Sequence, residues 1–120
     1  MAKRILIIED EEDIVEMTRM RLESCGFQVE AALAGNLGLE KAITFKPDLI
    51  LLDIIMPDID GWEVCRRLRA HPATKETPVI ILTAAQSTQL EKNVKEVGAN
   101  QVVLKPFNDA DLIDIIKKFF

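Results

Sequence analysis

Five polar residues directly follow short apolar runs that lie far apart in the sequence. The runs hold three or four Ile, Val and Leu residues each, which is too short for a helix and typical of a buried strand. If these strands are parallel, the residues that follow them meet at one edge of a sheet, where open α/β folds bind ligands. The five residues are Glu9 and Asp10 after Ile5–Ile8, Asp53 after Leu49–Leu52, Thr83 after Val79–Leu82, and Lys105 after Val102–Leu104.

Together, these side chains could bind a cation and accept a phosphoryl group. Three carboxylates close to one another repel at neutral pH, so a cation is expected to offset their charge. Mg²⁺ fits best, because it takes one or two carboxylates together with water and phosphate oxygens. A carboxylate beside Mg²⁺ is also a competent nucleophile toward phosphorus and would form an aspartyl phosphate. Lys105 would neutralise phosphoryl oxygens, and the Thr83 hydroxyl would donate one hydrogen bond to them.

The rest of the chain predicts the elements that hold these residues. A weaker run, Gln28–Ala32, alternates polar and apolar residues, as an edge strand does. Between the runs, apolar residues recur at three- and four-residue spacing, which predicts five helices. The residues expected to face the core are Val15, Thr18, Leu22 and Cys25; Leu39, Ala42 and Ile43; Cys65 and Leu68; Leu90, Val94 and Val97; and Leu112, Ile115, Ile116 and Phe119.

Capping residues mark the expected starts of three of these helices. Asp60, Ser87 and Asn108 are candidate N-caps. Strands that alternate with helices imply a parallel sheet covered on both faces. The continuously apolar runs suit the middle of that sheet, which predicts an α/β fold with the flavodoxin-like strand order 2-1-3-4-5 and five helices.

Composition is that of one globular domain, which we expect to span residues 1–120. The chain is 48% hydrophobic and 29% charged, and its length suits a single domain. A net charge of −5, with five Phe and one Trp, argues against direct nucleic-acid binding. The apolar runs are too short for a membrane span or a signal peptide. We therefore expect a cytoplasmic protein without membrane contact, in which Cys25 and Cys65 are buried, reduced thiols.

Six segments carry a family resemblance over nearly the whole chain: Ile7–Glu11, Asp48–Pro57, Asp60–Gly61, Ile81–Ala84, Gly98–Ala99 and Lys105–Phe107. With them, the sequence resembles the receiver domain of two-component response regulators, in the CheY-like superfamily. The resemblance implies a signalling phosphoacceptor that catalyses only its own phosphorylation and dephosphorylation. Its partners would be a sensor histidine kinase or histidine phosphotransfer protein and an unknown output protein or domain.

The same resemblance implies a role for each site residue. Asp53 would accept the phosphoryl group from a phosphohistidine. Asp10 would bind Mg²⁺ directly, Glu9 through a water molecule, and Ile55 through its backbone carbonyl. Thr83 and Lys105 would contact the phosphoryl group, and a cis peptide bond between Lys105 and Pro106 would aim the lysine.

Three positions differ from the usual receiver pattern. Glu9 stands where Asp is commoner, although its longer side chain still reaches a metal-bound water. Val102 occupies the place of an aromatic residue that moves when the threonine engages phosphate, so the aromatic half of that switch is absent. Asn100 and Gln101 replace an acidic pair found in members that dimerise, so we expect a monomer or weak dimer.

Further interpretations concern hydrolysis and the chain end. The resemblance implies that Ile55 and Ala85 flank the phosphoryl site; their apolar side chains offer no group to orient water, which predicts slow self-dephosphorylation. Phe119 and Phe120 either close the domain or begin a connection to an output domain.

Three alternative functions remain for this pattern of residues. A haloacid-dehalogenase-type phosphohydrolase would need an Asp at position 55, where the chain has Ile55. An FMN or nucleotide binder would need a Gly- and Ser-rich first loop rather than the acidic segment at 9–13. The third alternative is a degenerate receiver that serves only as a protein-binding adaptor.

Overall fold

The computed structural model describes residues 2–84 and 89–120. The predicted cap Ser87 and the predicted flanking residue Ala85 lie outside these described residues. The elements alternate along the chain as β1 (Arg4–Ile8), α1 (Glu12–Ser24), β2 (Gln28–Ala32), α2 (Gly35–Phe45), β3 (Leu49–Asp53), α3 (Gly61–Ala70), β4 (Val79–Thr83), α4 (Leu90–Val97), β5 (Gln101–Leu104) and α5 (Asp109–Lys117).

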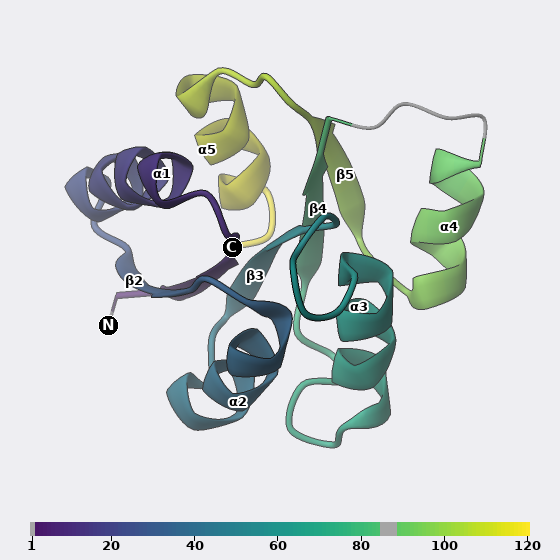
Figure 1. Ribbon diagram of the computed structural model, residues 1–120. Coiled ribbons are helices and arrows are strands. Elements are labelled where there is room, and N and C mark those ends of the chain that lie inside the picture. The colour runs from purple at the N-terminus through teal and green to yellow at the C-terminus, as the bar shows by residue number, and fades with distance from the viewer. Residues whose placement is uncertain (1, 85–88) are drawn as a thin grey trace.

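The strands form one parallel sheet in the predicted order, β2-β1-β3-β4-β5 (Figure 1). Ile8 of β1 pairs with Leu52 of β3, which in turn pairs with Ile81 of β4. The residues of β3 and β4 are all buried, as the continuously apolar runs predicted. The register therefore brings the carboxyl ends of the central strands to one edge.

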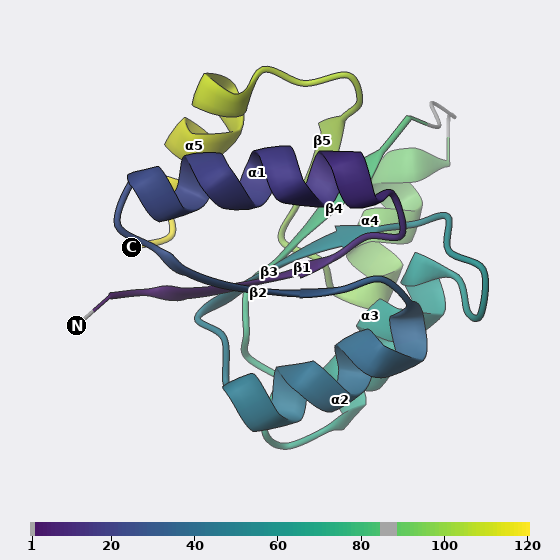
Figure 2. The ribbon, with the colours of Figure 1, turned by 60° about the vertical axis from the view of Figure 1, so that its left-hand side comes forward.

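Helices cover both faces of the sheet (Figure 2). One core lies under α1 and α5 and includes Val15, Leu22, Leu112 and Ile116. The other core lies under α2, α3 and α4 and includes Ala42, Leu68 and Val97. Within the described residues, no helix combines the length and apolar character that a bilayer crossing requires.

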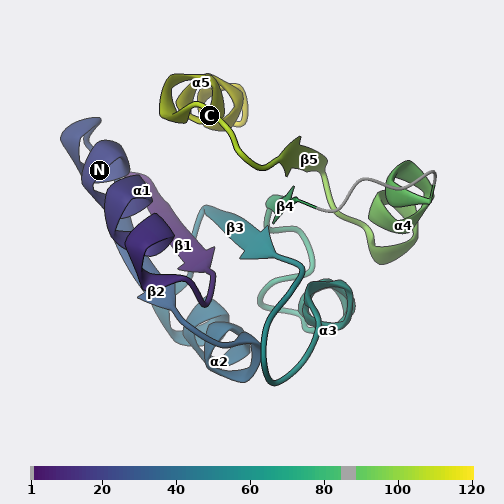
Figure 3. The ribbon, with the colours of Figure 1, turned by 45° about the horizontal axis from the view of Figure 1, so that its top comes forward.

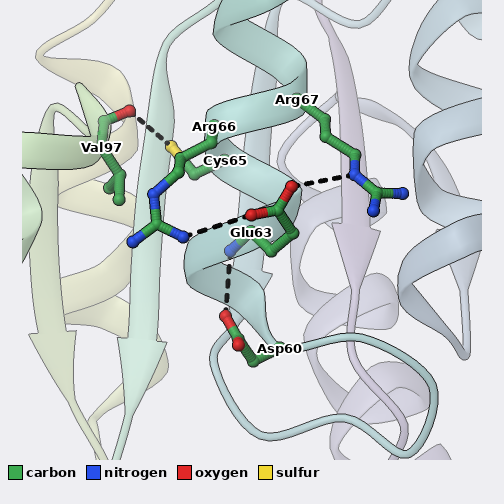
Figure 4. A network of polar contacts seen from close by, with 6 residues as sticks. All are labelled: Asp60, Glu63, Cys65, Arg66, Arg67 and Val97. Atoms are coloured by element: carbon green, nitrogen blue, oxygen red, sulfur yellow. Dashed lines mark hydrogen bonds and ion pairs between the residues drawn. The ribbon is translucent and has the colours of Figure 1, made fainter.

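Short polar contacts hold the N-terminus and the middle of α3 (Figure 4). The Asp60 carboxylate accepts a hydrogen bond from the Glu63 backbone N–H at 2.9 Å, which confirms the predicted N-cap. The Glu63 carboxylate is paired instead with Arg66 and Arg67 on the exposed surface. The buried Cys65 thiol donates to the Val97 carbonyl at 3.3 Å and so joins α3 to the C-terminal end of α4.

Two predictions about buried positions are wrong. Cys25 is exposed, because α1 ends at Ser24 and Cys25 is its C-cap, outside the helical stripe. Ile43 is 39% exposed, because the buried stripe of α2 runs through Gly35, Gly38 and Ala42. Residue 43 lies about 100° around the helix from residue 42 and therefore faces outward.

Candidate functional site

The predicted site residues lie at the carboxyl ends of β1, β3, β4 and β5, the strands that Figure 3 shows side by side. Glu9 and Asp10 directly follow β1, and Asp53 is the last residue of β3. One carboxylate oxygen from each of these three residues lies within 4.8 Å of the others. Glu9 is fully buried and Asp53 nearly so, whereas Asp10 is exposed. The structure thus brings the three predicted carboxylates together.

Lys105 joins this cluster from the far side of β4. Its Nζ lies 2.5 Å from Oε1 of Glu9 and 3.6 Å from Oδ1 of Asp53. The Lys105 backbone N–H donates to the Thr83 carbonyl at 2.8 Å, which ties the segment after β5 to the end of β4. The Lys105–Pro106 peptide bond is cis, as the resemblance implied.

The other predicted residues lie in β4, in β5 and in the loop after β3. Thr83 is buried at the end of β4, beside the strand that ends in Asp53. The backbone N–H of Ile55 lies 3.4 Å from Oδ1 of Asp53, while the Ile55 side chain is exposed. Val102 pairs with Ile81 in the sheet and packs against the core under α3.

Burial dominates the electrostatics of Glu9. Desolvation, followed by its contact with Asp53, raises the pKa of Glu9 from 4.5 to about 7, although the Lys105 ammonium acts in the opposite direction. Burial alone would lower the pKa of Lys105, but its hydrogen bond to Glu9 and the charge of Asp53 more than offset this, so the pKa is raised. Lys105 therefore stays an ammonium at neutral pH.

The residues present fit a hard divalent cation. Oε2 of Glu9 is buried and has no hydrogen-bond partner among the described residues, and such a buried oxygen requires some partner. The donors around it are carboxylate oxygens from Glu9, Asp10 and Asp53, which are the ligands that Mg²⁺ prefers. Three carboxylates against one ammonium also leave negative charge for a cation to offset.

An apolar pocket of about 360 Å³ lies beside these charges. Its walls include Ile14 and Met17 of α1 and Pro106 and Phe107, and Lys105 also contributes to its lining. The pocket gives the polar cluster an apolar border on the side of α1.

This fold and this cluster are those of a receiver domain, a signalling phosphoacceptor. The sequence model of the response regulator receiver domain family matches residues 5–117. The chain therefore belongs to that family. This membership favours the receiver over the phosphohydrolase and FMN-binding alternatives.

Individual relatives support the assignment. One relative is the DNA-binding dual master transcriptional regulator RpaA of Synechocystis sp., to which the chain is 37% identical. The matched region covers 92% of this chain and 46% of that protein. The structure of chemotaxis protein CheY4 of Vibrio cholerae matches with a TM-score of 0.95, 30% identity and full coverage of both chains. The receiver domain of sensor histidine kinase PA1611 of Pseudomonas aeruginosa PAO1, which has a magnesium ion in its active site cleft, matches with a TM-score of 0.90 and 28% identity over 99% of this chain and 98% of that one. The chain spans about half the length of the curated relatives it matches.

The structure also reveals one polar residue near the site that the sequence reasoning did not assign to it. Asp58 stands two residues before the helix cap Asp60, and its carboxylate accepts hydrogen bonds from the first residues of α2. The sequence contains an indirect signal, because Ala34, which precedes α2, has no side-chain acceptor to cap that helix.

Proposed function

We propose that Asp53 is the phosphoacceptor of this receiver domain and that the domain spans residues 1–120. The observation that carries this proposal is the position of the Asp53 carboxylate, which lies 3.6 Å from the Lys105 ammonium and within 4.8 Å of carboxylate oxygens of Glu9 and Asp10. A nucleophile needs such neighbours, because the incoming phosphoryl oxygens carry negative charge that must be offset.

In the proposed reaction, an Asp53 carboxylate oxygen attacks the phosphorus of a donor phosphohistidine. The new O–P bond forms as the N–P bond breaks, and the histidine nitrogen keeps the electron pair of the broken bond. Lys105 stabilises charge on the phosphoryl oxygens, and Thr83 donates its hydroxyl hydrogen to one of them. Because the sheet fixes the strands that carry Asp53 and Thr83, little reorganisation is needed.

Glu9, Asp10 and Asp53, with the backbone carbonyl of Ile55, would hold Mg²⁺ at this site. The ion would neutralise phosphoryl oxygens when bound. Asp10 is the exposed carboxylate and would bind it directly, whereas Glu9 would act through a water molecule. The unpartnered Oε2 of Glu9 supports this role.

The expected partners follow from this chemistry. The donor would be a sensor histidine kinase or a histidine phosphotransfer protein in the cytoplasm, and the apolar pocket beside Lys105 offers it a contact surface. The receiver of the signal would be an output protein or domain. We also propose that the domain promotes only its own phosphorylation and dephosphorylation, and that it is a monomer or weak dimer.

Phosphorylation would change the conformation through Thr83 and be relayed to α4, without an aromatic partner at Val102; residues 85–88, through which this route passes along the chain, lie outside the described residues. Val102 supports this proposal because its short side chain packs against the core in one place and has no large rotamer change to make. Beryllofluoride, a phosphoryl mimic, should shift NMR signals as far as α4. Shifts confined to the surroundings of Asp53 would contradict this route.

Intact-mass measurement tests the central proposal. Acetyl phosphate with Mg²⁺ should add the mass of one phosphoryl group to the wild type and none to Asp53→Asn. Chelation of Mg²⁺ should prevent the gain. A wild type that gains no mass would be a degenerate receiver that serves as an adaptor, and a gain retained in Asp53→Asn would move the phosphoacceptor to another residue.

A further inference from the structure

The N-terminus of α2 is capped from a distant part of the chain. The first backbone N–H groups of a helix lack partners within the helix, and Ala34 has no side-chain acceptor for them. Oδ1 of Asp58 accepts from the Gly35 N–H and Oδ2 from the Asn36 N–H, both at 2.8 Å. Both oxygens of one carboxylate are thus used by a helix that begins 23 residues earlier.

Close packing at Gly35 allows this contact. A Cβ added at Gly35 would lie 2.9 Å from Cγ1 of Ile59 and 3.0 Å from Cγ2 of Val64. Such distances are shorter than ordinary van der Waals contact. The absence of a side chain at Gly35 therefore lets the segment after β3 lie directly against α2.

Asp58 belongs to the loop at 54–60, which connects β3 to α3. The Gly61 N–H donates to the Ile54 carbonyl at 2.7 Å and closes the base of this loop. Asp60 attaches the loop to α3 by capping that helix (Figure 4). Asp58 attaches the loop to α2, so the loop is held against both neighbouring helices.

Ile55 lies between the base of the loop and the attachment at Asp58. Its side chain is 67% exposed, so side-chain packing does little to fix its backbone. Its N–H lies 3.4 Å from Oδ1 of Asp53, which is near the outer limit for a hydrogen bond. Its neighbours Ile54 and Met56 pack against the core, so the position of the Ile55 backbone depends on those contacts together with the attachments of the loop.

We propose that Asp58 is a positioning residue that holds the loop at 54–60 against α2 and thereby fixes the Ile55 carbonyl for the cation. The inference rests on the proposed function, because it assigns Asp58 a part in the same site. The backbone N–H groups of Asn36 and Gly35 lower the pKa of Asp58, which is consistent with a charged carboxylate that accepts two hydrogen bonds at neutral pH.

Calorimetric titration of Mg²⁺ into the wild type and Asp58→Ala tests the inference. The variant should bind Mg²⁺ about tenfold more weakly, as is typical when an outer partner of a metal site is lost. At saturating Mg²⁺, its phosphorylation by acetyl phosphate should return close to the wild-type rate, because Asp53, Thr83 and Lys105 are held by strands. Asp58→Asn retains one side-chain acceptor and should have an intermediate affinity.

Asp48→Ala is the matched control. The Asp48 carboxylate also accepts a backbone N–H from a distant residue, Arg4, at 2.8 Å, but it lies at the opposite edge of the sheet, where β3 begins. This variant should lose stability and keep wild-type Mg²⁺ affinity. Amide hydrogen exchange at Gly35 and Asn36 should quicken in Asp58→Ala and stay unchanged in Asp48→Ala.

The outcomes separate the two proposals. If the wild type is phosphorylated and Asp58→Ala binds Mg²⁺ as tightly as the wild type does, only the proposed role of Asp58 is overturned. Equal losses of affinity in the Asp58 and Asp48 variants would also overturn it, because they would indicate a general loss of stability. A wild type that neither binds Mg²⁺ nor gains phosphoryl mass would overturn the proposed function itself.

Discussion

In the metal-free protein, we expect folding stability to fall as the pH rises from about 4.5 to about 7. The cause is Glu9, whose pKa burial raises from 4.5 to about 7. Below pH 4.5, Glu9 is protonated in both the folded and the unfolded state. As the pH rises through this window, the unfolded chain releases its proton first, so the folded state binds more protons and loses stability. Above about pH 7, both states are ionised and the loss is complete.

The size of this effect follows from the change in pKa. At about 1.4 kcal/mol per pH unit, the rise from 4.5 to about 7 corresponds to a loss of about 3 kcal/mol. Such a loss is a large part of the 5–15 kcal/mol typical of a folded domain. Asp58 has the opposite sign: its lowered pKa contributes stability that is lost as the pH falls through values below 3.8, outside this window.

Urea unfolding in EDTA, followed by far-UV circular dichroism at several pH values, measures the effect. Glu9→Gln removes the titrating group with little change of shape, so the stability of this variant should vary far less across the window. If wild type and Glu9→Gln showed the same pH dependence, or if wild-type stability rose between pH 5 and 7, the reasoning about Glu9 would be refuted.

Three further perturbations test other parts of the site. Gly61→Ala would place a Cβ 2.4 Å from the Asp53 carbonyl oxygen and should cost about 2 to 3 kcal/mol in urea unfolding. Gly26 has a φ of 93°, but no described atom lies within 4 Å of an added Cβ, so Gly26→Ala should cost only about 1 kcal/mol. If Gly61→Ala and Gly26→Ala cost the same, the steric explanation is contradicted. Ile55→Asn should hasten loss of the phosphoryl group, measured by mass over time, because it adds a group that can orient water; an unchanged rate would refute the predicted effect of the apolar Ile55. Mg²⁺ at about ten times its Kd should stabilise the wild type by about 1.4 kcal/mol. Its effect on Tm should be larger at high than at low pH, since its ligands must be deprotonated. A rise in Tm of the same size in Asp10→Asn would place the ion elsewhere.

The positions of the site residues were predictable because, in a parallel sheet, the place of a residue relative to its strand determines at which edge of the sheet it lies. A residue that follows a buried strand must lie at the carboxyl edge, and neighbouring strands are about 4.8 Å apart. Asp53 and Thr83 end two paired strands, so their proximity needs only the strand order. The continuously apolar runs indicated which strands are central, and the flavodoxin-like order is one that satisfies this pattern.

The contacts between loops and helices were not predictable in the same way. Asn100 was interpreted as the loss of an acidic residue. In the structure, its Oδ1 accepts from the Val79 backbone N–H at 2.8 Å and from the Arg69 guanidinium at 3.0 Å. Arg69 also donates to the Gly98 carbonyl at the end of α4. These contacts depend on where the end of α3, the start of β4 and the loop at 98–100 lie in space, and no periodicity in the sequence reports that.

Glu9 shows why the chemistry itself could be predicted. It extends the apolar run of β1 and is fully buried with one oxygen unpartnered among the described residues, an arrangement that disfavours folding. An apolar residue there would give a more stable sheet but no oxygen for a cation. A sequence that places an acid where local packing favours Ile or Leu therefore indicates a function that outweighs stability. The same reasoning explains why Asp58 was missed: it is exposed in a loop just before a helix, where a carboxylate contradicts no local preference.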